Sequence, residues 1–109
     1  MHIYNVTVNV DESIHDEWLV WIEKHISEVL ETGHFLSAKM TQVLVEEEMG
    51  GVTYSIQYSA KTYKDIKNYY KFSAEKLRGD GLKKFADKML AFRTELKVIK
   101  EFYPMKKNN

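Results

Sequence analysis

The chain has 109 residues, a formal net charge of zero, 44% hydrophobic and 29% charged residues, and no cysteine. These proportions are typical of a folded domain, and they exclude a disordered chain, disulfide bonds and thiolate metal sites. We expect a single domain over residues 1–104 and a disordered tail over residues 105–109. A cytoplasmic location is expected, because neither a signal peptide nor an apolar run of membrane-spanning length is present.

The first predicted element is a strand over residues 2–10, where apolar residues alternate with polar ones. Alternation of this kind is typical of a strand with one buried face, here Tyr4, Val6, Val8 and Val10. Ser13 and Asp16 have the spacing of a capping box, so a helix is expected to follow. Apolar residues recur at helical spacing after it, and Gly33 is expected to end the helix.

Residues 35–48 and 51–59 predict a β-hairpin around Met49, Gly50 and Gly51. In the second run the apolar side chains face one way: Val52, Tyr54, Ile56 and Tyr58. In the first run, apolar residues occur at both odd and even positions, so the sequence does not decide which face of that strand is buried.

Thr62 and Asp65 form a second capping-box pattern and predict another helix. The apolar stripe of this helix is Ile66, Tyr69, Tyr70, Ser73 and Leu77. Gly79-Asp80-Gly81 is expected to break it, with a shorter helix after the break. A last strand is expected over residues 91–102, with Phe92, Thr94, Leu96 and Val98 on one side and Arg93, Glu95 and Lys97 on the other.

The order β-α-β-β-α-β predicts an α+β, ferredoxin-like fold, with two helices on one face of a four-stranded antiparallel sheet. With the valine and tyrosine faces under the helices, we expect polar side chains on the uncovered face, and we place Arg93 there. That face could be solvated, bind RNA, or line a cavity closed by a second subunit. The candidate ligand-binding residues are Asn5, Thr7, Ser55 and Gln57 for hydrogen bonds and Arg93 for an anionic group.

RNA-binding proteins of this topology stack bases on aromatic side chains of the central strands. The corresponding positions here are Thr53 and Ser55, which have no ring. Residues 1–60 have 2 basic and 10 acidic side chains, and residues 61–109 have 14 and 6. We expect these halves to neutralise each other within one fold, and we expect no nucleic-acid partner and no membrane partner.

His25 is the candidate acid or base, because it lies on the apolar side of the first predicted helix. The four histidines lack the i, i+4 spacing of a zinc-binding helix. The run Glu46-Glu47-Glu48 points to alternating faces of a strand and does not converge on a cation. No nucleophile motif or phosphate-binding loop is present. We therefore expect no metal and no cofactor, and a binding protein rather than an enzyme.

The segments YNVTVNVDESIHDEWLVWI, EEEMGGVTYSIQY and KKFADKMLAFRTELKVI resemble an uncharacterised bacterial family of short ferredoxin-like domains of unknown function. The resemblance covers residues 2–102. A second set of residues is similar to the dimeric α/β-barrel superfamily: Trp18, Trp21, His25, Gly33 and Phe35. That superfamily includes cofactor-independent monooxygenases, small cyclases and stress-response domains. The resemblance implies a homodimer in which two sheets face each other. The family pattern has charged helical residues where this chain has Gly79-Asp80-Gly81, which puts an inherited pocket shape in doubt.

The resulting hypothesis is a small cytoplasmic homodimer that binds a small molecule in a polar cavity at the sheet face. One alternative is a protein-interaction or structural module without a pocket, using the acidic and basic faces. Another is a cofactor-independent monooxygenase or cyclase, on the superfamily resemblance alone. The sequence names no ligand and no substrate.

Overall fold

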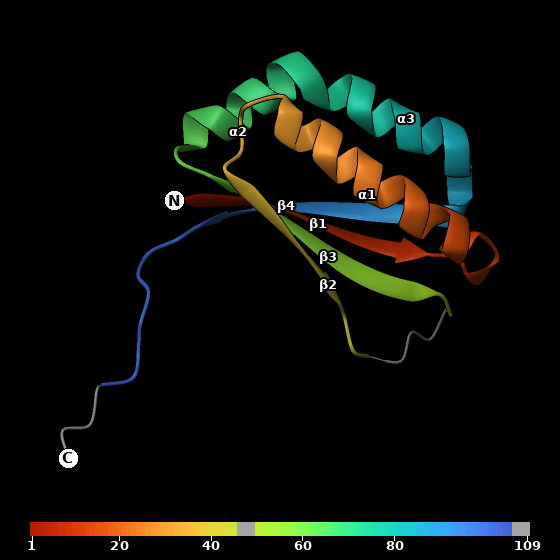
Figure 1. Ribbon diagram of the computed structural model, residues 1–109, viewed down its shortest axis with the longest axis horizontal. Helices are drawn as coiled ribbons and strands as arrows, with labels where there is room; N and C mark the ends of the chain where they lie inside the picture. Colours follow the sequence, from red (N-terminus) through yellow and green to blue (C-terminus); the bar gives the residue numbers. More distant parts are fainter. Residues whose placement is uncertain (46–49, 106–109) are drawn as a thin grey trace.

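Four antiparallel strands form one sheet in the computed structural model, which describes residues 1–45 and 50–105 (Figure 1). The strand order is β2-β3-β1-β4. The strands are β1 (His2–Val10), β2 (Ser37–Gln42), β3 (Val52–Ala60) and β4 (Met89–Lys97). This arrangement confirms the predicted ferredoxin-like fold, with β1 and β3 at the centre.

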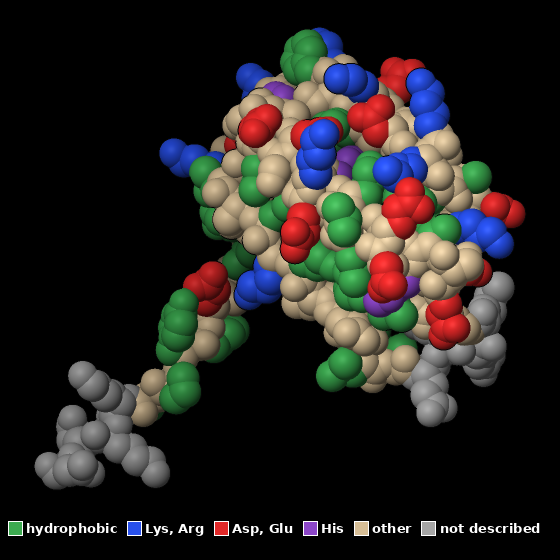
Figure 2. Space-filling model, turned by 45° about the vertical axis from the view of Figure 1, so that its right-hand side comes forward, with side chains coloured by type: hydrophobic (Ala, Val, Ile, Leu, Met, Phe, Trp, Pro, Cys, Tyr) green, Lys and Arg blue, Asp and Glu red, His purple; other side chains and the backbone are tan. Residues whose placement is uncertain are grey.

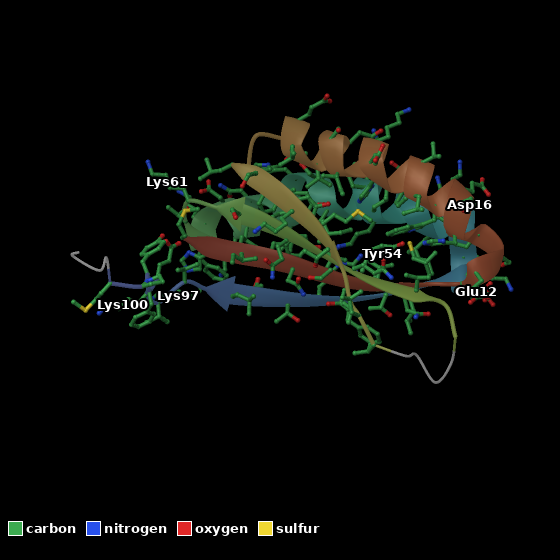
Figure 3. All side chains as sticks on the ribbon, turned by 60° about the horizontal axis from the view of Figure 1, so that its bottom comes forward. Glu12, Asp16, Tyr54, Lys61, Lys97 and Lys100 are labelled. Carbon is green, nitrogen blue, oxygen red and sulfur yellow. The ribbon has the colours of Figure 1, made fainter. Side chains whose placement is uncertain are left out.

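The helices all lie on one face of this sheet and leave the other uncovered (Figures 1 and 3). A single turn, η1 (Glu12–Ile14), leads into α1 (His15–Glu31). The second helical segment of this layer is continuous and consists of α2 (Tyr63–Tyr69), the π-helical η2 (Tyr70–Ala74) and α3 (Glu75–Phe85). A last turn, η3 (Ala86–Lys88), connects to β4.

The helix ends confirm two of the predicted signals and correct a third. Thr62 and Asp65 form the expected capping box, and Gly33 ends the first helix with φ +84°. Ser13 and Asp16 do not form one, because Asp11 caps the preceding turn. The backbone N–H and the hydroxyl of Ser13 both donate to the Asp11 carboxylate, at 2.9 and 2.6 Å.

The core lies between the helices and the predicted inner faces of the central strands. Trp18 of α1 and Ile66 of α2 are fully buried, together with Val10 and Ile56 of the sheet. In β2, whose phase the sequence leaves open, Ala38 and Met40 pack against this core. Burial of large side chains at these positions removes apolar area from water and stabilises the fold.

The π-helical segment η2 shifts the buried side of the second helical segment by one residue. The predicted stripe continues from Tyr69 to Ser73, but the structure buries Ala74 instead. A π-helical turn holds one residue more than an α-helical turn. The buried positions therefore step by five residues from Tyr69 to Ala74, and α3 buries Leu77, Gly81 and Phe85.

The predicted helix break at Gly79-Asp80-Gly81 is wrong, because α3 passes through these residues to Phe85. Neither glycine has a positive φ. The structure explains Gly81 by packing: a Cβ there would lie 3.0 Å from the Trp21 ring and 3.0 Å from the Met89 side chain. A Cβ at Gly79 would meet nothing within 4 Å.

Gly79→Ala is therefore expected to stabilise the protein, and Gly81→Ala is not. Alanine in a helix interior is favoured over glycine by about 0.8–1 kcal/mol, and Gly79→Ala should gain most of this. Gly81→Ala should lose the gain or become destabilising, because the new methyl group presses on Trp21. Urea unfolding of both variants measures the difference, and equal stabilisation by the two would contradict this packing role.

The last strand ends at Lys97 rather than at residue 102. Lys97 pairs with His2, the first residue of β1, so no partner strand remains beyond it. The segment over residues 98–105 leaves the body of the protein and exposes apolar side chains, among them Ile99, Phe102 and Tyr103 (Figure 2). The predicted turn at Met49 and residues 106–109 of the predicted tail lie outside the described residues.

The two faces of β4 are the reverse of what we expected from the sequence. Arg93 pairs with Val6, so it lies on the helix-covered face, and Phe92 pairs with Thr7 on the uncovered face. Leu90 and Leu96 share the face of Phe92, and all three are exposed. The alternation of β4 is therefore correct, but its apolar side points away from the core.

Side chains of both signs are mixed on the face of the protein that Figure 2 shows. Among residues 1–45 and 50–105, one ion pair links the acidic and basic halves of the chain, Lys84 with Glu17 at 3.6 Å. Exposed pairs of this kind contribute about 0–1 kcal/mol. No helix in the described residues is long and apolar enough to cross a membrane. The cytoplasmic location stays a prediction.

Candidate functional site

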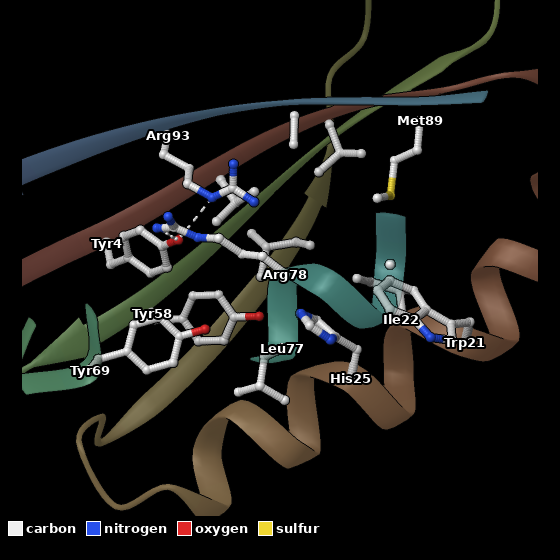
Figure 4. Close-up of a pocket in the computed structure, with 15 residues that line it drawn as sticks. Tyr4, Trp21, Ile22, His25, Tyr58, Tyr69, Leu77, Arg78, Met89 and Arg93 are labelled. Atoms are coloured by element: carbon white, nitrogen blue, oxygen red, sulfur yellow. Dashed lines mark hydrogen bonds between the residues drawn. The ribbon is translucent and has the colours of Figure 1, made fainter. Parts of the chain in front are cut away.

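A cavity of about 50 Å³ lies between the sheet and the helices (Figure 4). Its floor comes from the inner faces of β1, β3 and β4, and its walls come from α1, α2 and α3. The lining residues from the sheet are Tyr4, Val6, Val8, Ile56, Tyr58, Met89, Ala91 and Arg93. Those from the helices are Trp21, Ile22, His25, Tyr69, Leu77, Arg78 and Gly81.

Two arginines, one from the helices and one from the sheet, both contact one phenol oxygen in this cavity. Nη2 of Arg78, on α3, donates to the Tyr4 hydroxyl oxygen at 2.9 Å, and Nε of Arg93, on β4, donates to the same atom at 3.1 Å. Within the described part of the chain, neither guanidinium forms an ion pair with a carboxylate. The cavity therefore has two positive charges that form no ion pair with a carboxylate of residues 1–45 or 50–105.

Two further hydroxyls enter the cavity without a partner. Tyr58 and Tyr69 are each 2% exposed, and Figure 4 shows their hydroxyls directed toward the cavity. No hydrogen bond joins either hydroxyl to another of the described residues. Neither hydroxyl oxygen is among the buried, unpartnered side-chain atoms of the described residues, so both are open to water or a ligand in the cavity.

Burial keeps these phenols protonated. It raises the pKa of Tyr69 to about 12, against an opposing influence of Arg78 and Arg93. It raises the pKa of Tyr58 further above its usual range. Both hydroxyls are therefore available as hydrogen-bond donors at neutral pH.

His25 lies on the α1 side of the cavity and stacks on Trp21, with ring centroids 4.5 Å apart. Burial is the main cause that lowers the pKa of His25, and nearby Arg93 lowers it further. Glu28 and Asp80 act in the opposite direction. The lowered pKa of His25 favours the uncharged ring at neutral pH, and its buried Nδ1 has no hydrogen-bond partner among the described residues.

The rest of the cavity is apolar. Figure 4 shows Met89, Trp21 and Ile22 at the side opposite the arginines, and the inner residues of β1 and β3 add valine and isoleucine side chains. Arg93 is exposed although it lines the cavity, so the polar end reaches solvent. An apolar pocket with a few convergent polar groups is the usual form of a small-molecule site.

The predicted site residues, with His25 as acid or base and the others as ligand-binding residues, separate into two groups on opposite faces of the sheet. His25 and Arg93 come together in the cavity. Asn5, Thr7, Ser55 and Gln57 lie on the uncovered face, because they alternate with the core residues of β1 and β3. The placement of Arg93 beside those four residues is wrong, since the register of β4 puts it under the helices.

Most of the four polar side chains on the uncovered face bond one another. The Asn5 amide nitrogen donates to the Thr7 hydroxyl at 3.1 Å, and the Ser55 hydroxyl donates to the Asn5 amide oxygen at 2.7 Å. Their capacity for hydrogen bonds to a ligand is thus partly used. A ligand-binding role for them stays a prediction.

The cavity also contains residues that we did not predict as part of a site. These are Tyr4, Tyr58 and Tyr69, which the sequence places on apolar faces, and Arg78. One signal in the sequence points to the first three: they are tyrosines at positions where phenylalanine would fill the core equally well. A buried phenol needs a hydrogen-bond partner, so repeated tyrosine on inner faces indicates a polar site.

The described residues contain no cluster of three or more histidine or acidic side chains that could hold a metal ion. The expected absence of a metal and of a cofactor therefore stays a prediction. The positively charged groups of the cavity favour an anion over a cation.

A family model described as a domain of unknown function, DUF4286, matches residues 1–99. No curated protein matches the chain. Several solved structures share its fold. A dimeric ferredoxin-like protein from an uncultured marine organism is 13% identical with a TM-score of 0.69, and the match covers 93% of this chain and 97% of that one.

A proposed antibiotic biosynthesis monooxygenase from Deinococcus radiodurans is 11% identical with a TM-score of 0.63, over 97% of this chain and 100% of that one. A proposed monooxygenase from Shewanella loihica is 10% identical with a TM-score of 0.54, over 92% and 96%. At such identities these similarities establish the fold, and fold alone does not determine function.

Proposed function

Because this chain belongs to the DUF4286 family, whose function is unknown, we propose a function from the site itself: a homodimeric protein that binds a small molecule between the helices and the sheet. In this proposal the uncovered face of the sheet serves assembly, and the cavity on the helix-covered face holds the ligand.

The observation that carries the proposal is the unpartnered polar lining of the cavity. Tyr58 and Tyr69 are almost fully buried, and their hydroxyls find no acceptor among the described residues. A closed core would be filled equally well by phenylalanine at these positions, so the two hydroxyls point to a polar occupant. A bound molecule that accepts their hydrogen bonds is such an occupant.

Assembly through the uncovered face is supported by the apolar row on β4. Leu90, Phe92 and Leu96 are 55%, 60% and 40% exposed and lie on one face of an edge strand. In a two-fold dimer the same surface of each subunit faces the other, so the apolar row of one copy can cover that of its partner. The similar protein from the uncultured marine organism is described as dimeric, which supports a dimer here.

Thermal unfolding with a panel of small anions, cations and neutral metabolites tests ligand binding. A ligand at about 100 times its Kd stabilises the folded state by about 2.7 kcal/mol, so at least one compound should raise Tm by several degrees. Ala91→Leu, which fills part of the cavity, should abolish the shift.

Thr94→Leu is the matched control, because Thr94 lies on the uncovered face of the same strand and should leave the shift intact. If no compound in the panel raises Tm, or if Ala91→Leu leaves the shift unchanged, the cavity is not a binding site. The first result would favour an interaction module without a pocket.

A further inference from the structure

We propose that the ligand of this cavity is a small monocarboxylic acid, whose carboxylate binds Arg78 and Arg93 and whose short apolar body lies toward Met89 and Ile22. This inference rests on the proposed function, because it names the class of molecule that the same cavity holds.

The hydrogen-bonding groups of the cavity are mostly donors. Arg78 and Arg93 have only donors, and both direct an N–H to the single Tyr4 oxygen. The Nε of Arg78 is buried and has no acceptor among the residues that the structure describes. Tyr58 and Tyr69 add two hydroxyls that remain protonated. A ligand that only accepts hydrogen bonds complements this set, and an ionised carboxylate is such a group.

The charge of the site selects an anion. Arginine stays protonated in proteins, so the two guanidiniums keep their charge although the cavity is largely apolar. Arg78 is half-buried and Arg93 is exposed, and the described residues supply no carboxylate that pairs with either. The planar guanidinium also matches the geometry of an oxyanion with two parallel hydrogen bonds.

The size and the apolar end distinguish a carboxylic acid from an inorganic anion. A cavity of about 50 Å³ has room for roughly three to five water molecules, which is also the size of an acid with about five non-hydrogen atoms. Figure 4 shows Met89 and Ile22 across the cavity from the arginines, where they offer no hydrogen bond. Inorganic phosphate would leave that end without an apolar group to contact.

Propionate is the probe, and propionamide is the neutral molecule of nearly the same shape. We would titrate each into the ¹⁵N-labelled protein and follow the indole N–H signal of Trp21, whose ring lines the cavity. Propionate should shift this signal saturably, and propionamide should bind at least about tenfold more weakly. Arg93→Gln and Arg78→Gln should each weaken propionate binding at least about tenfold and reduce its advantage over propionamide.

Lys97→Gln is the matched control for net charge, because Lys97 is an exposed cation on the same strand as Arg93 and does not line the cavity. It should leave the propionate affinity unchanged. Arg93 is exposed, so the Arg93→Gln variant is expected to fold. Arg78→Gln gives a second, separate measurement on α3.

The inference is overturned if propionamide binds as tightly as propionate, if both arginine variants bind propionate like the parent protein, or if phosphate binds more tightly than propionate. These failures differ from a failure of the proposed function. A neutral or cationic compound that raises Tm and depends on Ala91 would keep the cavity as a binding site and reject the acid as its ligand.

Discussion

Phe92→Asp is expected to convert the proposed homodimer into a monomer. Phe92 is at the middle of the exposed apolar row on β4, with Leu90 and Leu96 on either side. In a two-fold interface the substitution introduces two carboxylates, and each must lose water on association. Removal of a central aromatic side chain commonly costs 2–4 kcal/mol of binding free energy, so the dimer Kd should rise roughly 100-fold or more.

Light scattering on a sizing column, at several protein concentrations, measures this change. Val20→Asp is the control: Val20 is 75% exposed but lies on α1, on the other side of the sheet from Phe92. It introduces the same charge and should leave the dimer intact. A parent protein that is monomeric at all concentrations, or a Phe92→Asp variant that stays dimeric, would contradict assembly through this face.

Tyr4→Phe is expected to weaken ligand binding about 10- to 100-fold while the fold is kept. The Tyr4 oxygen accepts from both Arg78 and Arg93 and so holds the two guanidiniums at the cavity. A hydrogen bond to a charged group contributes about 1.5–3 kcal/mol. Without this acceptor the arginines lose their common anchor, and each can turn away from the position in which it meets a carboxylate.

Tyr70→Phe is the matched control for Tyr4→Phe. The Tyr70 ring packs against Tyr4, but its hydroxyl donates to Glu95 at 2.9 Å, and Tyr70 does not line the cavity. The two variants lose the same atom from neighbouring rings, and only Tyr4→Phe should change the affinity for propionate. Equal affinities for the two variants and the parent protein would mean that Tyr4 does not position the arginines.

The element order and most helix boundaries could be predicted because they depend on local chemistry. Alternating residues in β1 and β3 define one buried face, and the Thr62–Asp65 capping box satisfies backbone groups within a single turn. The same local reasoning misplaces the capping residue of the first helix. Asp11, Ser13 and Asp16 are all suitable polar residues there, and the η1 turn decides between them.

The parts that could not be predicted depend on packing between distant segments. Alternation in β4 identifies two faces, but only its register with β1 shows that Arg93 lies under the helices. The apolar side of β4 then lies outside, where a partner can cover it, so hydrophobicity alone gives the opposite answer. Gly81 likewise looks like a helix breaker until Trp21 is seen against it.

The candidate site was predictable only in part. His25 is at the cavity because helical spacing places it on the inner side of α1, and Arg93 is there despite the reversed face. Tyr58 and Tyr69 fit a core pattern equally well, since a phenol ring packs like a phenylalanine ring. Whether their hydroxyls find a partner depends on atoms from four other elements, and sequence spacing carries no information on that.

A crystal structure of the protein soaked in propionate tests the central claim most directly, because the two faces of the sheet offer competing places for a ligand. The account predicts density for the acid between the helices and the sheet, with its carboxylate beside Arg78 and Arg93. Density on the uncovered face beside Asn5 and Ser55, with only water in the cavity, would contradict it.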